Sequence, residues 1–302
     1  MGVLPVIWPL ELAKSSDSDT YSQIDTSSLM AKTGDASNPA PEKGRTGSWD
    51  VWTQIYGSRS HSGSTDTDLW VGYIGSHYYV NDGTLIGALA QLDNSESNNS
   101  ATKQISDGTG WMVGPYVTGR INNTSLNYDL RAAFGKSDNA VKPKDVAKEN
   151  FETTREMVSG SLQGAANAWN GNDVSVSASL MYWKEKQKAF TNSAGKIIPS
   201  SESKLGESNI GVSLSRLYIS PDGNSTRPSV GLSAVYNFEG LKNENPDEFS
   251  LGEGDIRGRV EAGLNAKRAS GLSVNFSTFY DGIGIDDYES YGGMVRLTKP
   301  LN

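Results

Sequence analysis

A two-residue alternation of side-chain type recurs from Ser48 to the end of the chain and limits the fold more than any other feature. Between residues 126 and 135, leucine, tyrosine, alanine and phenylalanine occupy one face of an extended strand, while asparagine, aspartate and arginine share the other. Residues 174–182, 228–236 and 256–266 repeat this pattern. Such alternation predicts β-strands that have one apolar face and one polar face.

Twelve segments of this kind follow one another, and they predict an all-β fold, a single twelve-stranded antiparallel transmembrane β-barrel. An even number of strands is what a single-chain bacterial outer-membrane barrel requires when both chain ends lie on one side. The predicted strands cover residues 48–60, 67–80, 84–93, 108–120, 126–137, 151–166, 173–187, 204–218, 226–239, 255–267, 271–282 and 287–299.

The connections between these segments alternate in length, and that alternation favours a membrane barrel over a soluble one. Outer-membrane barrels have short periplasmic turns and longer external loops. The predicted tight turns are residues 81–83, 121–125, 167–172, 219–225 and 268–270. The predicted long, polar loops are residues 94–107, 138–150, 188–203 and 240–254. The remaining connections, near 61–66 and 283–286, are short and depart from the rule.

Composition agrees with a barrel and excludes several other classes of protein. Only 36% of the residues are hydrophobic, but a spanning strand needs only about 9–11 residues, and only every second one must face lipid. The chain has no cysteine, which excludes a disulfide framework and a thiolate metal site. Its net charge of −8 argues against a nucleic-acid partner, because binding phosphates requires a basic face.

Seven charged residues fall on the faces that the alternation turns inward, and we predict that they line the lumen. An arginine that faced lipid near the membrane midplane would cost about 2–4 kcal/mol. Two roles remain open: a salt-bridge lattice that stiffens the barrel, or a polar track for a segment that passes through or plugs it. The residues are Arg120, Asp129, Arg131, Arg257, Arg259, Glu261 and Arg296.

Catalytic signatures are absent, so we expect no enzyme activity, no cofactor and no metal. The sequence has no nucleophile elbow, zinc-protease helix or phosphate loop. His61 lies near Ser60 and Asp66, but we expect a solvated loop there, since a triad needs residues held rigidly by separate elements. His77 is expected at the membrane interface. Aromatic residues near strand ends predict two interfacial girdles: Trp49, Tyr78, Tyr79, Trp111, Trp169, Tyr218, Tyr280 and Tyr288.

Residues 1–47 have the composition of a linker, with a short helix around Tyr21–Lys32 that would lie in the lumen. The first residues do not resemble a secretory signal, so we expect a longer precursor that carries one.

From Trp49 onward the chain resembles the autotransporter β-domain in the form found in α-proteobacteria. The resemblance depends on the order of short stretches along some 250 residues, since none of them is specific alone. They are residues 49–52 (WDVW), 110–116 (GWMVGPY), 129–138 (DLRAAFGKSD), 185–191 (EKQKAFT), 257–263 (RGRVEAG), 280–282 (YDG) and 291–293 (YGG).

This resemblance implies an outer-membrane translocator with a narrow polar pore, in which residues 1–47 thread the barrel formed by residues 48–302. The implied partners are outer-membrane lipids, the outer-membrane assembly machinery and the chain's own N-terminal passenger, with one chain forming each barrel. Many family members end in an aromatic residue, whereas this chain ends Pro300-Leu301-Asn302. The alternatives are a free-standing porin or structural barrel and, less favoured, a barrel enzyme.

Overall fold

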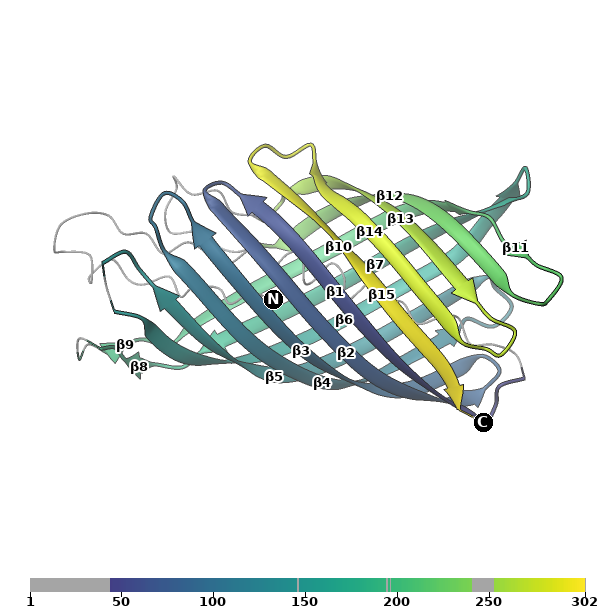
Figure 1. Cartoon of the computed structure of the whole chain (residues 1–302), viewed down its shortest axis with the longest axis horizontal. Coiled ribbons are helices and arrows are strands. Elements are labelled where there is room, and N and C mark those ends of the chain that lie inside the picture. The colour runs from purple at the N-terminus through teal and green to yellow at the C-terminus, as the bar shows by residue number, and fades with distance from the viewer. Residues whose placement is uncertain (1–43, 146, 194, 196, 241–252, 302) are drawn as a thin grey trace.

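A computed structural model describes residues 44–145, 147–193, 195, 197–240 and 253–301, and its strands are tilted steeply around one axis (Figure 1). These residues contain no helix that is long and apolar enough to cross a membrane. The predicted helix around Tyr21–Lys32 lies outside them. The strands are β1 (Trp49–Ser62), β2 (Thr65–Asn81), β3 (Thr84–Asn99), β4 (Ile105–Arg120), β5 (Leu126–Lys142), β6 (Glu149–Trp169), β7 (Asn172–Gln187), β8 (Phe190–Thr191), β9 (Ile197–Ile198), β10 (Ser201–Ser215), β11 (Tyr218–Ile219), β12 (Ser225–Glu239), β13 (Ile256–Lys267), β14 (Ser273–Ile283) and β15 (Tyr288–Leu301).

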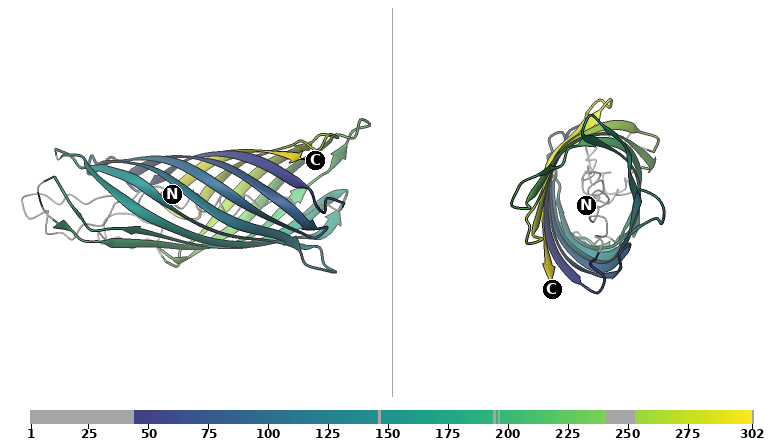
Figure 2. Two further views of the ribbon diagram at one scale, coloured as in Figure 1. Left: turned by 90° about the horizontal axis from the view of Figure 1, so that it is seen from below. Right: turned by 90° about the vertical axis from the view of Figure 1, so that its right-hand side faces the viewer.

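The twelve long strands form a closed ring, which Figure 2 shows end-on. Each pairs antiparallel with its neighbour in sequence, β10 pairs with β12, and β1 closes the ring against β15 from Trp49↔Leu301 to Ser62↔Tyr288. Because the ring is closed, none of its strands has an unpaired edge. A barrel in lipid requires this, because the membrane interior has no water to form hydrogen bonds with backbone groups. The predicted twelve-stranded antiparallel barrel is confirmed.

Two predicted external loops are instead continuations of strands. Residues 94–99 belong to β3 and residues 105–107 to β4, while 138–142 and 149–150 extend β5 and β6. Beyond the membrane the outward face of a strand meets water, and the inward face here carries small buried polar residues such as Ser95, Ser97 and Asn139, so a polar composition does not indicate a loop. The prediction of long loops at 94–107 and 138–150 was therefore wrong. On that side of the barrel, residues 188–200 and 240–255 remain the longest connections, and we take this side as external.

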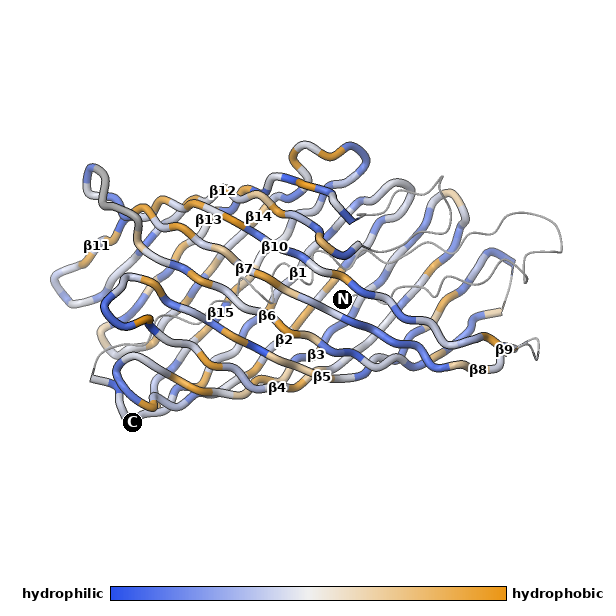
Figure 3. The backbone as a smooth tube through the Cα atoms, turned by 180° about the vertical axis from the view of Figure 1, so that it is seen from behind, coloured by the Kyte–Doolittle hydropathy of each residue, from blue (hydrophilic) through white to orange (hydrophobic). Residues whose placement is uncertain are grey.

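The outer wall has an apolar band toward the periplasmic side and a polar extension toward the external side. On β7 the outward positions run from Val174 to Tyr182, about the length that a spanning strand needs, and then change to Lys184 and Lys186. Figure 3 shows the same division along the barrel, with hydrophobic residues concentrated toward the end that holds the C-terminus and long hydrophilic stretches in the strands that lead toward β8. The apolar band marks the part of the barrel that lies in lipid.

A pair of arginine substitutions on β7 tests which face meets lipid. Leu180 is 60% exposed on the outer wall, whereas its neighbour Ser179 lines the interior. We expect Leu180→Arg to lower the free energy of unfolding by about 2–4 kcal/mol, and Ser179→Arg to change it far less. Urea unfolding in lipid vesicles measures both. Equal losses in the two variants would contradict the assignment of the faces.

The aromatic girdles are only partly present. Trp49 and Tyr78 lie on the outer wall with ring centroids 5.1 Å apart, and Trp111 and Tyr280 are also exposed outward. The girdle prediction was wrong for Tyr79 and Tyr288. These side chains are 2% and 3% exposed and face the interior. Tyr218 is exposed in the hairpin beyond the barrel, and the side chain of Trp169 lies outside the described set.

Candidate functional site in the barrel lumen

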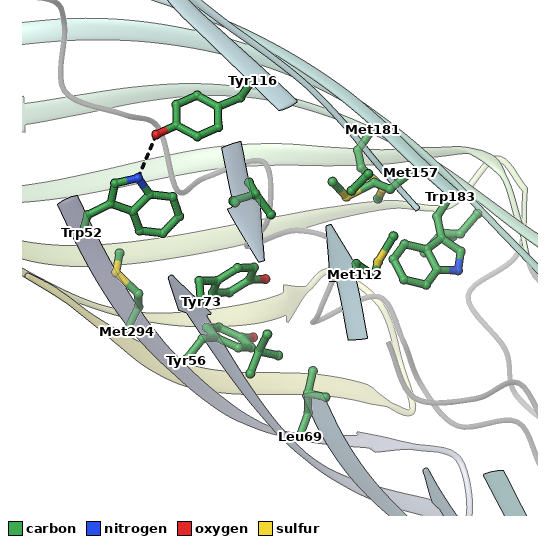
Figure 4. Close-up of a cluster of buried hydrophobic side chains, with 14 of the residues drawn as sticks. Trp52, Tyr56, Leu69, Tyr73, Met112, Tyr116, Met157, Met181, Trp183 and Met294 are labelled. Atoms are coloured by element: carbon green, nitrogen blue, oxygen red, sulfur yellow. Dashed lines mark hydrogen bonds between the residues drawn. The ribbon is translucent and has the colours of Figure 1, made fainter. Parts of the chain in front are cut away.

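An apolar and aromatic cluster lines the lumen, drawn mainly from β1–β4 and joined by Met157, Met181 and Trp183 of β6 and β7, as the close-up in Figure 4 shows. Trp52, Tyr56, Tyr73 and Met112 are buried here, and the indole Nε1 of Trp52 donates a hydrogen bond of 2.8 Å to the hydroxyl of Tyr116. The resemblance implied a narrow polar pore, and this cluster is an apolar part of it, although Gln54 and Gln91 of the same strands are also buried. In a narrow barrel, inward side chains pack against one another as in a core.

The opposite wall, built by β6, β7, β10, β12, β13 and β14, carries small polar side chains. They surround a cavity of about 260 Å³. A channel bounded by serine, glycine and asparagine offers hydrogen-bond donors and acceptors without bulk. Its lining includes Ser161, Gln163, Ser177, Ser179, Asn209, Gly211, Ser213, Ser229, Gly231, Ser233, Glu261, Gly263, Asn275 and Ser277.

A buried ion-pair cluster joins β10, β13 and β14 nearer the external end. Arg257 binds Glu207 at 2.7 Å and Asp281 at 3.0 Å, and Arg259 binds the same Asp281 at 2.6 Å. Arg257 also donates to the side-chain oxygen of Asn237 at 3.0 Å. Two of the predicted lumenal arginines thus share one carboxylate, and each guanidinium has a fixed partner.

A second cluster joins β3, β6 and β7, and the sequence analysis did not identify it. Arg155 binds Asp93 at 2.7 Å and Glu185 at 3.4 Å, while Gln91 donates to Asp93 at 3.1 Å. The guanidinium of Arg155 lies 5.7 Å from the ring of Trp183. The available signal was that Asp93 shares strand parity with Gln91 and Leu89, which places its carboxylate on the inner face of β3.

The other predicted lumenal residues lie apart from these two clusters. Asp129 and Arg131 on β5 pair at 2.5 Å, and the guanidinium of Arg296 lies 4.1 Å from the centroid of the Trp52 ring. Glu261 is half-buried and lines the serine-walled cavity. Arg120 is half-buried at the end of β4 and forms no ion pair with the residues that the structure describes.

A third buried cluster lies at the periplasmic end, where β1 begins. Asp50 accepts a hydrogen bond of 2.8 Å from the hydroxyl of Tyr79, and it also pairs with Arg45. The ring of His77 contacts Asp50 at 3.3 Å through Nε2 and the Tyr116 hydroxyl at 2.9 Å through Nδ1. His77 is 0% exposed, so the expectation of an interfacial position was wrong.

The Ser60, His61 and Asp66 group cannot act as a triad. His61 pairs with Asp66 at 2.8 Å on the outer wall, whereas Ser60 is buried on the inner face of the same strand. His61 belongs to β1 and not to a loop, because the alternation continues to Ser62. Within the described ranges, no group of three histidine, aspartate or glutamate side chains could hold a metal ion.

Comparison with known proteins identifies the family to which this barrel belongs. The sequence model of the autotransporter beta-domain matches residues 51–278. The chain belongs to the autotransporter β-domain family. It is therefore an outer-membrane barrel of bacteria, in a family of translocator barrels. No curated protein sequence matches the chain.

Solved autotransporter barrels share its fold at low sequence identity. The β-domain of BrkA from Bordetella is 16% identical with a TM-score of 0.65, covering 82% of this chain and 98% of that one. The transport unit of AIDA-I from Escherichia coli is 17% identical with a TM-score of 0.63, covering 82% and 89%. The translocator domain of NalP from Neisseria meningitidis is 14% identical with a TM-score of 0.62, covering 90% and 92%.

Proposed function

We propose that this autotransporter β-domain anchors an N-terminal passenger in the outer membrane and helps it reach the cell surface, with residues 1–47 threading the lumen. The proposal involves no bond chemistry. It depends on where the chain lies just before β1 and on the character of the lumenal wall.

The chain before β1 is fixed to the periplasmic rim, and this observation carries the proposal. The backbone N–H of Gly44 donates 2.9 Å to Asp82 in the β2–β3 turn, and the Thr46 hydroxyl donates 3.0 Å to the same carboxylate. The guanidinium of Arg45 reaches the lumenal Asp50 and lies 4.9 Å from the ring of Tyr79. These contacts hold residues 44–46 at the rim, with Arg45 next to the lumenal Asp50, which supports a path into the lumen.

The lumenal wall suits a polypeptide of varied sequence. Its arginines at positions 155, 257 and 259 are held by carboxylates within the barrel, so they do not bind strongly to a passing chain. The serine-walled side provides hydrogen bonds to an extended backbone. Of the seven predicted lumenal residues, we assign Asp129, Arg131, Arg257 and Arg259 to the lattice that stiffens the barrel, and Glu261 to the track.

Cysteine cross-linking tests whether the N-terminal segment occupies the lumen. The chain has no cysteine of its own, so introduced pairs are unambiguous. We expect Ser177→Cys, on the inner wall, to cross-link with single cysteines placed in turn along residues 20–40. Its neighbour Ala178→Cys, on the outer wall, serves as the matched control. Cross-links at neither position, or equal cross-linking at both, would contradict threading.

A further inference from the structure

A group of lysines stands on the outer wall just above the apolar band. Lys136 lies on β5, Lys184 and Lys186 on β7, and Lys204 on β10, and all four are outside the lumen and at least partly exposed. We call these four residues the lysine wall. Three strand spacings of about 4.8 Å separate β5 from β10, so the wall is about 14 Å wide.

Strand pairing brings the lysine wall into two adjacent rows. Lys184 is directly opposite Lys204, and Lys186 is separated from Lys136 only by Thr154 on β6. Like charges directly opposite each other destabilise a sheet. Glu202 offsets part of this repulsion, because its carboxylate accepts from Lys184 at 2.9 Å and from Lys204 at 3.1 Å.

The compensation is incomplete. These two rows hold four lysines against Glu156 and Glu202, so the rows themselves are positive, while Asp138 and Glu152 face outward in the next row toward the external end. The outer wall across the barrel has the opposite character. There the outward positions at the same end of β1–β3 include Asp66, Asp68 and Glu96, with Arg59 bound to Asp68. The positive charge is thus confined to the two lysine rows just above the apolar band.

The wall directly beneath the lysines is apolar and exposed. Phe134 is 60% exposed, Val158 61%, Leu180 60% and Tyr182 37%. A surface with cations above and apolar side chains below matches a lipid whose headgroup is anionic, because the acyl chains contact the apolar residues while the phosphate meets the ammonium groups.

We propose that the lysine wall binds the phosphorylated headgroup of a lipid in the outer leaflet, with its acyl chains against Phe134, Val158 and Leu180. The bound lipid neutralises the excess charge of the two lysine rows and lies against this side of the barrel. This inference depends on the outer-membrane location and not on passenger export.

Native mass spectrometry of the full-length barrel with bisphosphorylated lipid A as the probe tests the site. We expect Lys136→Gln combined with Lys184→Gln and Lys186→Gln to weaken lipid A binding by at least about tenfold, since each lysine near a charged membrane surface contributes about 1 kcal/mol. The matched control replaces Lys103, Lys142 and Lys144, which lie at the same end away from the wall, and should bind as the native protein does. Heat-modifiable migration on gels verifies that both variants are folded.

Three results would overturn the proposal. One is equal binding of lipid A by the folded wall variant and the native protein. Another is equal binding of lipid A from which both phosphates have been removed. The third is complete displacement of lipid A by an equal concentration of inorganic phosphate, which would make free phosphate the ligand.

Discussion

Deleting residues 1–43 is expected to raise the single-channel conductance of the barrel in planar bilayers severalfold. The reason is that a chain threading the serine-walled side excludes ions from the lumen, where the described walls leave a cavity of about 260 Å³. The deletion keeps residues 44–48, so the contacts of Gly44, Thr46 and Asp82 at the rim are retained.

A second deletion serves as the control for this experiment. Removing residues 241–252, in the connection between β12 and β13, shortens a connection that is not part of the proposed threading segment and should leave the conductance close to that of the full chain. If removal of residues 1–43 left the conductance unchanged, threading would be contradicted, and a high conductance in both forms would favour a free-standing porin.

Replacing Asp281 with alanine is expected to lower the free energy of unfolding by about 3–5 kcal/mol, the usual effect of removing one partner from a buried ion pair. Asp281 is 0% exposed and binds both Arg257 and Arg259. Its removal takes a carboxylate from two buried guanidinium groups on β13. The midpoint of urea unfolding in lipid vesicles measures the loss.

The matched control removes an aspartate from an exposed ion pair. Asp68 binds Arg59 on the outer wall, where their side chains are 46% and 56% exposed, and such pairs contribute less than about 1 kcal/mol. Asp68→Ala should therefore unfold almost as the native protein does. If the two alanine variants lost the same stability, the lumenal clusters would not be the lattice that stiffens the barrel.

The strands that cross the membrane could be predicted because lipid imposes a simple rule on them. Every outward position on β7 from Val174 to Tyr182 must be apolar or small, and that rule is visible in a single sequence. The rule ends where the membrane ends. Residues 94–99 are polar on both faces of β3, so their strand character was not recognised.

The partners of the lumenal charges could not be predicted, because they depend on strand register. Alternation placed Arg257 and Arg259 on the inner face, but Glu207, the partner of Arg257, lies fifty residues before it along the chain. Arg155 meets Asp93 across sixty-two residues. The apolar lumenal cluster was also missed. In β3 the buried Leu85 and Leu89 are interleaved with outward apolar residues, so one face could not be told from the other.

Surface display of a reporter tests the export claim most directly. A signal peptide and an epitope-tagged reporter are joined ahead of Met1, and protease is added to intact cells. We predict that the protease removes the reporter, that Gly231→Trp, which fills the serine-walled cavity, strongly reduces display, and that the outward Leu232→Trp does not. A folded barrel in the outer membrane whose reporter stays protected in the periplasm would contradict the account.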